Sequence, residues 1–143
     1  MLRIEKNLKV ENTRRNILTL LAVYGTLRTG FGNNKYCLAN STSLGLGYVN
    51  GIRMHNTGWF PICCETDDIT AQVIVEVFQT PDIDLAYCDN LEGHPNWYCR
   101  QPVEVLTEDG EIVKAEMYLQ SPEACDNYSI IWSGDWTKKG DKH

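Results

Sequence analysis

The chain has 143 residues, the size of one domain, and its 43% hydrophobic and 22% charged content is ordinary for a globular protein. No apolar run approaches the roughly 20 residues that a membrane-spanning helix requires, and no apolar region with a small-residue cleavage site marks a signal peptide. The net charge is −6, and an acidic protein offers no electrostatic footprint for nucleic acid. We therefore expect a cytoplasmic protein that binds neither nucleic acid nor membrane.

The two ends of the chain differ in composition from the region between them. Residues 1–16 carry five basic and two acidic side chains, whereas the remainder carries eight basic and seventeen acidic ones. Apolar side chains at alternate positions of residues 1–16 fit an added edge strand, and the charge density fits a mobile leader equally well. We predict a charged N-terminal extension (1–16), a single domain (17–137) and a disordered tail (138–143).

A buried strand that ends at a glycine turn is predicted near the N-terminus. Residues 17–23 form an apolar run with only Thr19 inside it, and Tyr24-Gly25-Thr26-Leu27 follows. A continuous apolar run bounded by glycine is typical of a buried strand that leads into a tight loop. Gly25 permits a bend where a side chain would clash, and the N–H groups of such a turn can face one concavity. The turn thus suits a carboxylate or carbonyl oxygen, although an ordinary strand-to-loop turn has the same pattern.

Short strands interrupted by glycines are predicted for the middle of the chain. After a loop and a helical turn at residues 35–39, residues 42–54 alternate like a strand but contain Gly45, Gly47 and Gly51. Glycines inside strands mark bulges, bends or close backbone contacts, as in small curved barrels. Two further strands are expected, one at 59–64 and one, rich in β-branched residues, at 71–79.

A helix is predicted to follow the strand at 71–79. Thr80 can cap its start, Pro81 suits the first helical position, and the two aspartates that follow favour the positive end of the helix dipole. Gly93 is placed to end the helix. Apolar residues at four-residue spacing predict the stripe that faces the core: Ile83, Tyr87 and Leu91.

The last part of the chain predicts a hairpin and a folded-back tail. Residues 98–107 and 111–120 form two strand patterns joined by a Glu-Asp-Gly turn. Trp132 and Trp136 stand in an otherwise polar segment, which we expect to pack back through its aromatic side chains. About seven short strands with one clear helix fit a mixed, barrel-like α+β domain.

The cysteines and histidines do not show the spacing of a metal site. None of the six cysteines forms a C-x-x-C pair, and the adjacent Cys63-Cys64 has poor geometry for an ordinary disulfide. His55, His94 and His143 are scattered, whereas a structural zinc site usually shows tight paired spacing. We therefore expect reduced, mostly buried thiols and no metal.

Glu92 is the candidate for proton transfer. It lies at the end of the predicted helix, where the negative end of the helix dipole raises the pKa of a carboxyl group. Asp89 lies on the same face, where its like charge acts in the same direction, and walls formed by Trp97 and Tyr98 add desolvation. All three effects predict a base suited to neutral pH, whereas the structural alternative is a solvated glutamate at a helix end.

Two motifs together resemble the γ-glutamylcyclotransferase-like (AIG2-like) superfamily. The first is Val23-Tyr24-Gly25-Thr26-Leu27-Arg28, and the second is Leu91-Glu92-Gly93-His94-Pro95-Asn96-Trp97-Tyr98-Cys99-Arg100. The second is most similar to the γ-glutamylamine cyclotransferase branch, and the resemblance runs from about residue 18 to Trp136. The charged leader is longer than the family pattern, and Cys63-Cys64 has no counterpart in it.

The resemblance implies a small mixed β-barrel with one main helix and flanking short helices, and a cavity between the glycine turn and the glutamate. It implies that the backbone of Tyr24, Gly25, Thr26 and Leu27 holds the α-amino and α-carboxylate ends of a small-molecule γ-glutamyl substrate. Glu92 would take a proton from the α-ammonium group, and the amine would attack the γ-carbonyl of its own molecule. Return of the proton would release 5-oxoproline and an amine, without a metal or cofactor.

Other residues of the second motif are compatible with more than one role. Tyr98 is expected to help line the pocket, and alternation places Arg100 on the same face, where an ion-pair role is equally compatible. His94 fits a contact to the leaving group or simple exposure. Two alternatives to the cyclotransferase stay open: a non-enzymatic ligand-binding or interaction module on the same fold, and a γ-glutamyl amide hydrolase. The sequence fixes neither the leaving amine nor the oligomeric state.

Overall fold

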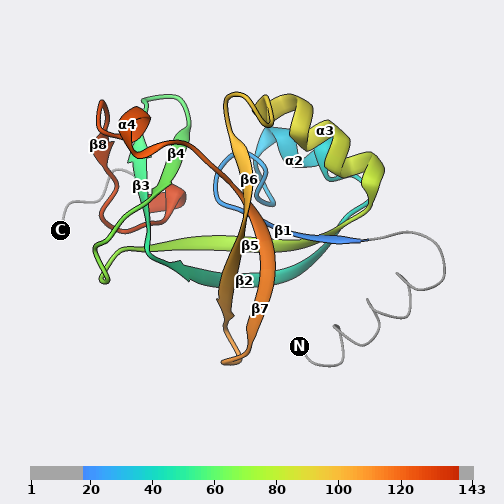
Figure 1. Ribbon diagram of the computed structural model, residues 1–143. Coiled ribbons are helices and arrows are strands. Elements are labelled where there is room, and N and C mark those ends of the chain that lie inside the picture. The colour runs from blue at the N-terminus through green and yellow to red at the C-terminus, as the bar shows by residue number, and fades with distance from the viewer. Residues whose placement is uncertain (1–17, 139–143) are drawn as a thin grey trace.

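The computed structural model describes residues 18–138, which form a barrel with a small sheet beside it. The closed barrel has the strand order β1-β5-β2-β6-β7, and the second sheet has the order β4-β3-β8 (Figure 1). The strands are β1 (Thr19–Val23), β2 (Thr42–Asn50), β3 (Ile52–Asn56), β4 (Pro61–Glu65), β5 (Gln72–Thr80), β6 (Cys99–Thr107), β7 (Ile112–Leu119) and β8 (Ser129–Ile130). The helices are α2 (Gly32–Cys37), α3 (Asp82–Glu92), α4 (Pro122–Cys125) and a 3-10 helix (Trp136–Lys138). The predicted α+β class, a small mixed β-barrel with one main helix and flanking short helices, is confirmed.

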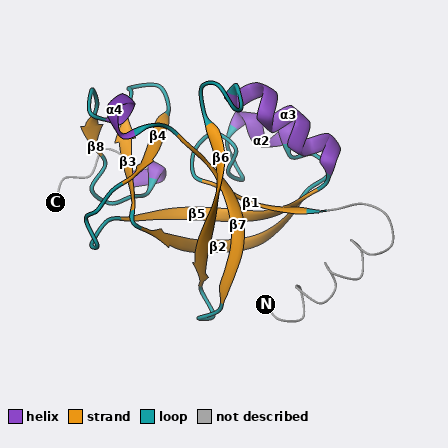
Figure 2. Ribbon diagram, in the orientation of Figure 1, coloured by secondary structure: helices purple, strands orange, loops and turns teal. Residues whose placement is uncertain are grey.

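Strand β1 closes the barrel and is buried on both faces. It pairs antiparallel with β5 along its whole length and parallel with β7 at Leu21. Ala22 faces the barrel core, whereas Leu21 and Val23 belong to a second apolar cluster that also contains Cys88 of α3. Because both faces are covered, the segment is apolar at successive positions instead of alternating. Figure 2 shows α2 and α3 together at one end of the barrel, with α4 beside the three-stranded sheet.

Glycines bend the chain where β2 leaves the barrel. The pairing of β2 with β5 shifts register between Ser43 and Gly45, as a bulge does. A Cβ at Gly47 would lie 2.6 Å from Val105 Cγ1, so β6 approaches too closely for any side chain there. Gly51 has a φ of 77° and divides the expected single strand 42–54 into β2 and β3, which belong to different sheets. The interpretation of these glycines as bends and close contacts is confirmed.

Helix α3 starts and faces the core differently from the prediction. Thr80 is the last residue of β5, and its hydroxyl donates to the Phe78 carbonyl 3.1 Å away, so Pro81 occupies the N-cap position instead. The predicted apolar stripe is wrong, because its three members are 42–57% exposed: Ile83, Tyr87 and Leu91. The buried residues of α3 are Asp84 and Cys88. The four-residue spacing identified one face of the helix, but the face that is buried is the one that carries the Asp84 carboxylate and the Cys88 thiol.

Asp84 anchors the first turn of α3 to the segment after α2. Its side chain is 1% exposed, yet each carboxylate oxygen accepts hydrogen bonds. The donors are the Asn40 backbone N–H at 2.7 Å, the Asn40 side-chain amide at 3.0 Å and the Ser41 hydroxyl at 2.7 Å. Three donors on one buried carboxylate compensate its desolvation, which explains why an acidic residue holds a core position.

The C-terminal segment packs back onto the protein as expected, but through one tryptophan. Trp136 is 4% exposed and belongs to the barrel core. Trp132 stays half-exposed, and the Arg53 guanidinium lies 5.1 Å from its ring centroid. Of the six free cysteines, all but the half-buried Cys99 are buried, as expected for mostly buried thiols.

Two predicted segments lie outside the described residues. These are the N-terminal extension (1–16) and the tail, of which only Lys138 is described, at the end of the 3-10 helix. Among residues 18–138, no helix has the length and apolar character needed to cross a bilayer.

Candidate active site

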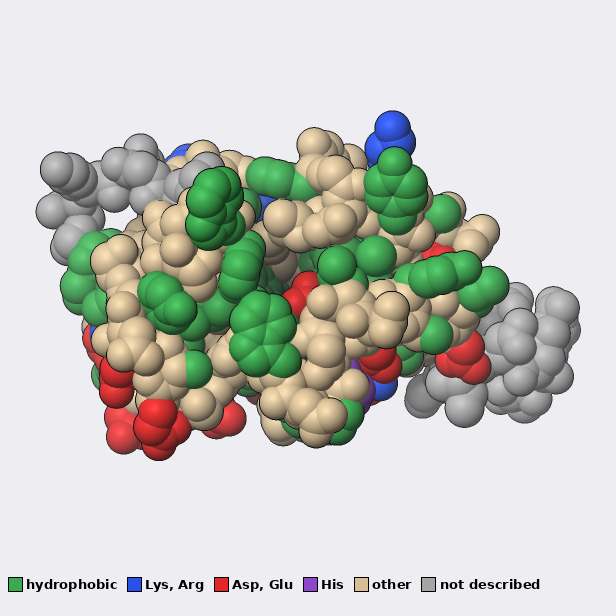
Figure 3. Space-filling model, turned by 90° about the horizontal axis from the view of Figure 1, so that it is seen from above, with side chains coloured by type: hydrophobic (Ala, Val, Ile, Leu, Met, Phe, Trp, Pro, Cys, Tyr) green, Lys and Arg blue, Asp and Glu red, His purple; other side chains and the backbone are tan. Residues whose placement is uncertain are grey.

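A cavity of about 240 Å³ lies where the turn after β1 meets the end of α3. Figure 3 shows a face on which hydrophobic side chains surround a hollow that contains acidic atoms. Two segments far apart in the sequence therefore border one space. Every site residue named from the sequence lines this cavity: Tyr24, Gly25, Thr26, Leu27, Glu92 and Tyr98.

Close packing explains the glycine in the turn after β1. A Cβ at Gly25 would lie 2.7 Å from Pro61 Cγ and 3.0 Å from Pro61 Cδ, at the start of β4. The turn is closed by a hydrogen bond of 3.0 Å from the Arg28 N–H to the Gly25 carbonyl. Gly25 is not among the glycines with positive φ, so its role here is close approach to the proline ring.

The turn presents backbone donors at the cavity. Within residues 18–138, the N–H groups of Gly25, Thr26 and Leu27 donate to no protein acceptor. The nearby Thr29 N–H, by contrast, donates to the Glu76 carboxylate at 2.8 Å. Since these three residues line the cavity, their amides are candidate donors to an oxygen of a bound molecule.

Two side chains of α2 and a backbone carbonyl of β7 hold the turn in place. The Asn33 amide donates to the Thr26 hydroxyl at 2.8 Å, and the Asn34 amide donates to the Leu27 carbonyl at 2.8 Å. The buried Tyr24 hydroxyl donates to the Tyr118 carbonyl at 2.6 Å. These hydrogen bonds fix the backbone of the turn before any ligand binds, which lowers the entropy lost on binding.

Glu92 is the last residue of α3, where a left-handed glycine ends the helix. Gly93 has a φ of 67°, and the His94 N–H donates back to the Asp89 carbonyl at 2.9 Å, which confirms the predicted helix end. The Glu92 side chain is half-buried, and desolvation by this burial raises its pKa from 4.5 to about 7. A carboxyl group with this pKa accepts and returns a proton near neutral pH.

The expected contribution of Asp89 to this pKa is wrong. The Asp89 carboxylate pairs with Arg100, at 2.7 Å from Nε and 3.0 Å from Nη2, and also accepts the Tyr118 hydroxyl at 2.6 Å. Burial acts to raise the pKa of Asp89, but the hydrogen bonds from Arg100 and Tyr118 outweigh it, so the pKa is lowered. Because its charge is compensated by Arg100, Asp89 is not a cause of the raised pKa of Glu92.

Of three further motif residues, Arg100 and His94 support the site, whereas Tyr98 enters it. Arg100 also pairs with Glu116, so the ion-pair interpretation of this residue is correct. The half-buried His94 ring accepts the Arg100 backbone N–H on Nδ1 at 3.1 Å. Tyr98 is the exception, because it lines the cavity while its hydroxyl donates to the Pro61 carbonyl at 3.1 Å.

Several cavity residues were not indicated by the sequence. Trp59 and Phe60 reach the cavity from the connection between β3 and β4, Pro61 from the start of β4, and Tyr118 from β7. The ring of Phe60 meets that of Trp97 edge-on, with centroids 5.7 Å apart. No local pattern marks these residues, because only the packing of the two sheets brings them to the cavity. Among the described lining residues Glu92 is the single acidic side chain.

The fold and the cavity define a small barrel protein with one half-buried carboxyl group of raised pKa in the same cavity as a glycine turn. The family described as gamma-glutamyl cyclotransferase, AIG2-like, matches residues 21–138, and the chain belongs to this family. A Methanocaldococcus jannaschii protein named as a candidate gamma-glutamylcyclotransferase is 32% identical over 114 residues, which cover 80% of this chain and 92% of the relative. The resemblance drawn from the two motifs is confirmed, and so, at the level of the family, is an enzyme of the cyclotransferase class.

Solved structures share the fold. YkqA from Bacillus subtilis has a TM-score of 0.71 and 28% identity, covering 85% of this chain but 40% of YkqA, so the present chain spans less than half of that protein. An AIG2-like protein from Mus musculus has a TM-score of 0.64 and 23% identity, covering 74% of this chain and 81% of that one. At this identity the mouse structure supports the fold alone.

Proposed function

We propose that the protein is a γ-glutamylamine cyclotransferase, which converts a γ-glutamyl amide into 5-oxoproline and a free amine. The observation that carries the proposal is Glu92, with a pKa raised to about 7, in the same cavity as three unpaired amides of the glycine turn. Family membership supports cyclotransferase chemistry. The preference for amines and the role of Glu92 go beyond family membership and belong to this proposal.

Binding is assigned to the glycine turn. The N–H groups of Gly25, Thr26 and Leu27 receive the α-carboxylate of the γ-glutamyl group. The substrate is held bent, so that its α-amine faces its own γ-carbonyl. Because nucleophile and electrophile belong to one molecule, positioning supplies most of the entropic advantage of the reaction. The protein then needs only to move one proton and to present donors to the developing oxyanion.

Proton transfer is assigned to Glu92. As a carboxylate it accepts a proton from the α-ammonium group, and the freed amine forms a C–N bond to the γ-carbonyl carbon. The tetrahedral intermediate collapses when Glu92 returns its proton to the departing nitrogen and the original C–N bond breaks. The second proton of the ring nitrogen passes to the released amine, which leaves as an ammonium ion. No water is consumed and the carboxylate is regenerated. A pKa of about 7 suits both directions of transfer, since both forms are populated near neutral pH.

The aromatic wall of the cavity supports an amine leaving group over a peptide. Trp59, Phe60 and Trp97 border the cavity, and the two tryptophans are 86% and 54% exposed. Methylene groups of an amine gain roughly 25 cal/mol for each Å² buried against such side chains. The carboxylate of a peptide or of glutathione would lose hydration there, and none of the described lining residues is lysine or arginine.

The test is product analysis on matched substrates. The protein is incubated with γ-glutamyl-ε-lysine, a γ-glutamyl dipeptide and glutathione, and 5-oxoproline and glutamate are quantified. A matched pair, γ-glutamyl-propylamine and γ-glutamyl-β-alanine, differs only in the terminal carboxylate. We expect 5-oxoproline without glutamate, and kcat/KM at least about tenfold higher for the propylamine, the equivalent of about 1.4 kcal/mol.

Each alternative outcome has its own meaning. Free glutamate identifies a hydrolase, since water then replaces the α-amine as nucleophile. Absence of both products with every substrate identifies a non-enzymatic binding module. Equal kcat/KM for the matched pair contradicts the preference for amines while leaving the cyclotransferase assignment intact.

A further inference from the structure

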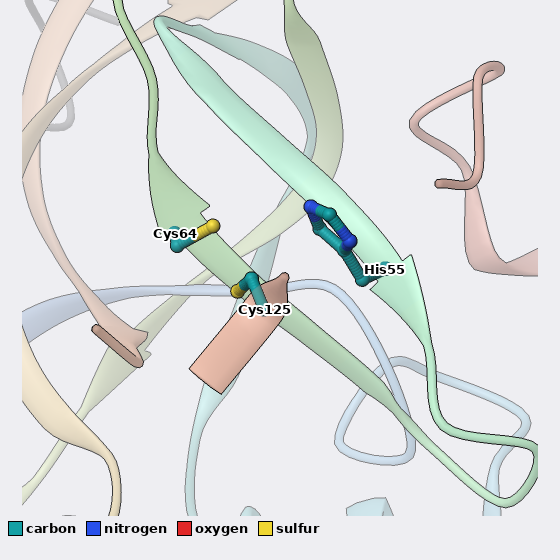
Figure 4. Close-up of side chains that lie close together, drawn as sticks. All are labelled: His55, Cys64 and Cys125. Carbon is teal, nitrogen blue, oxygen red and sulfur yellow. The ribbon is translucent and has the colours of Figure 1, made fainter. Parts of the chain in front are cut away.

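We propose that His55, Cys64 and Cys125 form a binding site for a thiophilic divalent cation, zinc in the first instance, separate from the cavity of Glu92. One ligand atom from each residue lies within 4.8 Å of the other two. Figure 4 shows the imidazole and the two sulfur atoms converging from three elements, namely β3, β4 and α4. Since none of the three residues lines the cavity, the site is independent of the proposed reaction.

Strand register places two of the ligands on one face. In the β3–β4 pair, His55 is opposite Ile62, and Cys64 is two positions further along β4. Diagonal neighbours on the same face lie within side-chain reach. Cys63 points to the opposite face and belongs to the barrel core. Helix α4 packs against β4 and supplies Cys125 from above this face.

The imidazole of His55 is already oriented as in a metal ligand. Its Nδ1 lies 2.8 Å from the Tyr128 backbone carbonyl, and a carbonyl only accepts, so Nδ1 carries the proton. In the neutral ring, Nε2 therefore keeps the free lone pair. Metal-binding histidines almost always donate their second N–H to a carbonyl or carboxylate in this way, which fixes both the tautomer and the ring orientation. This hydrogen bond is a second observation that points to a ligand.

Distance and charge both suit zinc. With Zn–S bonds of about 2.3 Å and Zn–N bonds of about 2.1 Å, tetrahedral ligand atoms lie about 3.6 to 3.8 Å apart, so the cluster needs to contract by about 1 Å. The three residues are buried, at 7%, 4% and 0% exposure. Two thiolates and one Zn²⁺ give zero net charge, which avoids burying an uncompensated ion. Two sulfurs and one imidazole nitrogen match zinc preferences, with solvent at the fourth position.

The charged groups near the cluster do not oppose a bound cation. The Arg53 side chain, on the same face of β3, forms an ion pair with Asp68, so its charge is compensated. Asp126, next to Cys125, is exposed and adds a negative charge at the surface. Residues 126–129, which follow Cys125, are all exposed, and the Tyr128 carbonyl of this segment reaches His55. The absence of paired cysteine spacing follows from this arrangement, because the three ligands come from separate elements.

The experiment uses the reduced, chelator-treated protein and zinc chloride alone. After gel filtration into metal-free buffer, we expect elemental analysis to find one zinc per chain. Cobalt in place of zinc should give a thiolate-to-metal charge-transfer band and tetrahedral d–d bands. Cys64→Ser and Cys125→Ser should each weaken zinc binding by more than about 100-fold. The half-buried Cys99 is the matched control, and Cys99→Ser should bind like the wild type.

Three results would overturn the site. They are failure of the reduced wild type to retain zinc, a cobalt adduct without a thiolate charge-transfer band, and undiminished zinc binding in the Cys64→Ser/Cys125→Ser double variant. The first two need only the wild-type chain, so the proposal stays testable even if the serine variants fail to fold. Each readout is independent of catalytic activity.

Discussion

Replacing Glu92 with glutamine should stabilise the fold above neutral pH. Burial raises the pKa of Glu92 from 4.5 to about 7, so the folded state disfavours its charged form. At 1.36 kcal/mol for each pKa unit, the shift corresponds to about 3 kcal/mol of the free energy of unfolding. Glutamine keeps the shape of the side chain and removes the charge.

The sign of this effect follows from proton binding. Below the unfolded pKa of 4.5, Glu92 is protonated in both states and the two proteins should be equally stable. As pH rises towards about 7, the unfolded chain ionises while the folded carboxyl keeps its proton, so wild-type stability falls. Above about pH 8 the variant should therefore be more stable by about 3 kcal/mol. Urea unfolding followed by tryptophan fluorescence at about pH 4 and about pH 8.5 measures the difference.

The same variant tests the proposed proton transfer. General acid–base catalysis typically contributes at least about 100-fold, so Glu92→Gln should lower kcat by that factor or more. Wild-type kcat/KM should rise with pH through a group of pKa about 7, and this step should vanish in the variant. Glu108→Gln, in the exposed turn between β6 and β7, is the control and should change neither activity nor the pH dependence of stability. Full activity of Glu92→Gln, or a stability difference that does not vary with pH, would refute the reasoning.

Two further substitutions test the frame of the cavity. Gly25→Ala places a Cβ 2.7 Å from Pro61 Cγ and should raise KM at least about tenfold, about 1.4 kcal/mol of binding. The matched control is Gly32→Ala, which has open space around it and should leave the kinetics unchanged. Similar KM values for the two variants would contradict the role of close packing. Asp84→Ala leaves buried donors unpaired and should lower the free energy of urea unfolding by about 3 kcal/mol, against less than about 1 kcal/mol for the exposed Asp82→Ala. Equal losses in the two aspartate variants would show that the buried anchor is not what holds α3.

The sequence identified the elements of the site because their signals are local. The apolar run before Gly25 is typical of a strand buried on both faces, and Gly93 is in the position that ends a helix in a left-handed turn. The glycines of β2 likewise indicated bends that the structure confirms. Each of these inferences depends on backbone conformation within a few residues.

Inferences that required knowledge of a partner failed or could not be made. Asp89 was expected to repel Glu92, but its charge is compensated by Arg100, which lies 2.7 Å away on another element. The helix face with the more hydrophobic residues is exposed, because the hydrogen bonds to Asp84 determine the side that is buried. The cysteine spacing gave no indication of the cluster at Cys64, since its members come from three elements.

The sequence alone therefore determined most of the barrel strands, the turn at Gly25, the acidic side chain at the end of α3 and the family. Only the tertiary structure decided that Glu92 is buried enough for its pKa to reach about 7, and which aromatic side chains border it. The physical reason is the distance along the chain over which each effect acts. Backbone preferences depend on a few consecutive residues, whereas desolvation and charge compensation depend on groups that come together only when the barrel closes.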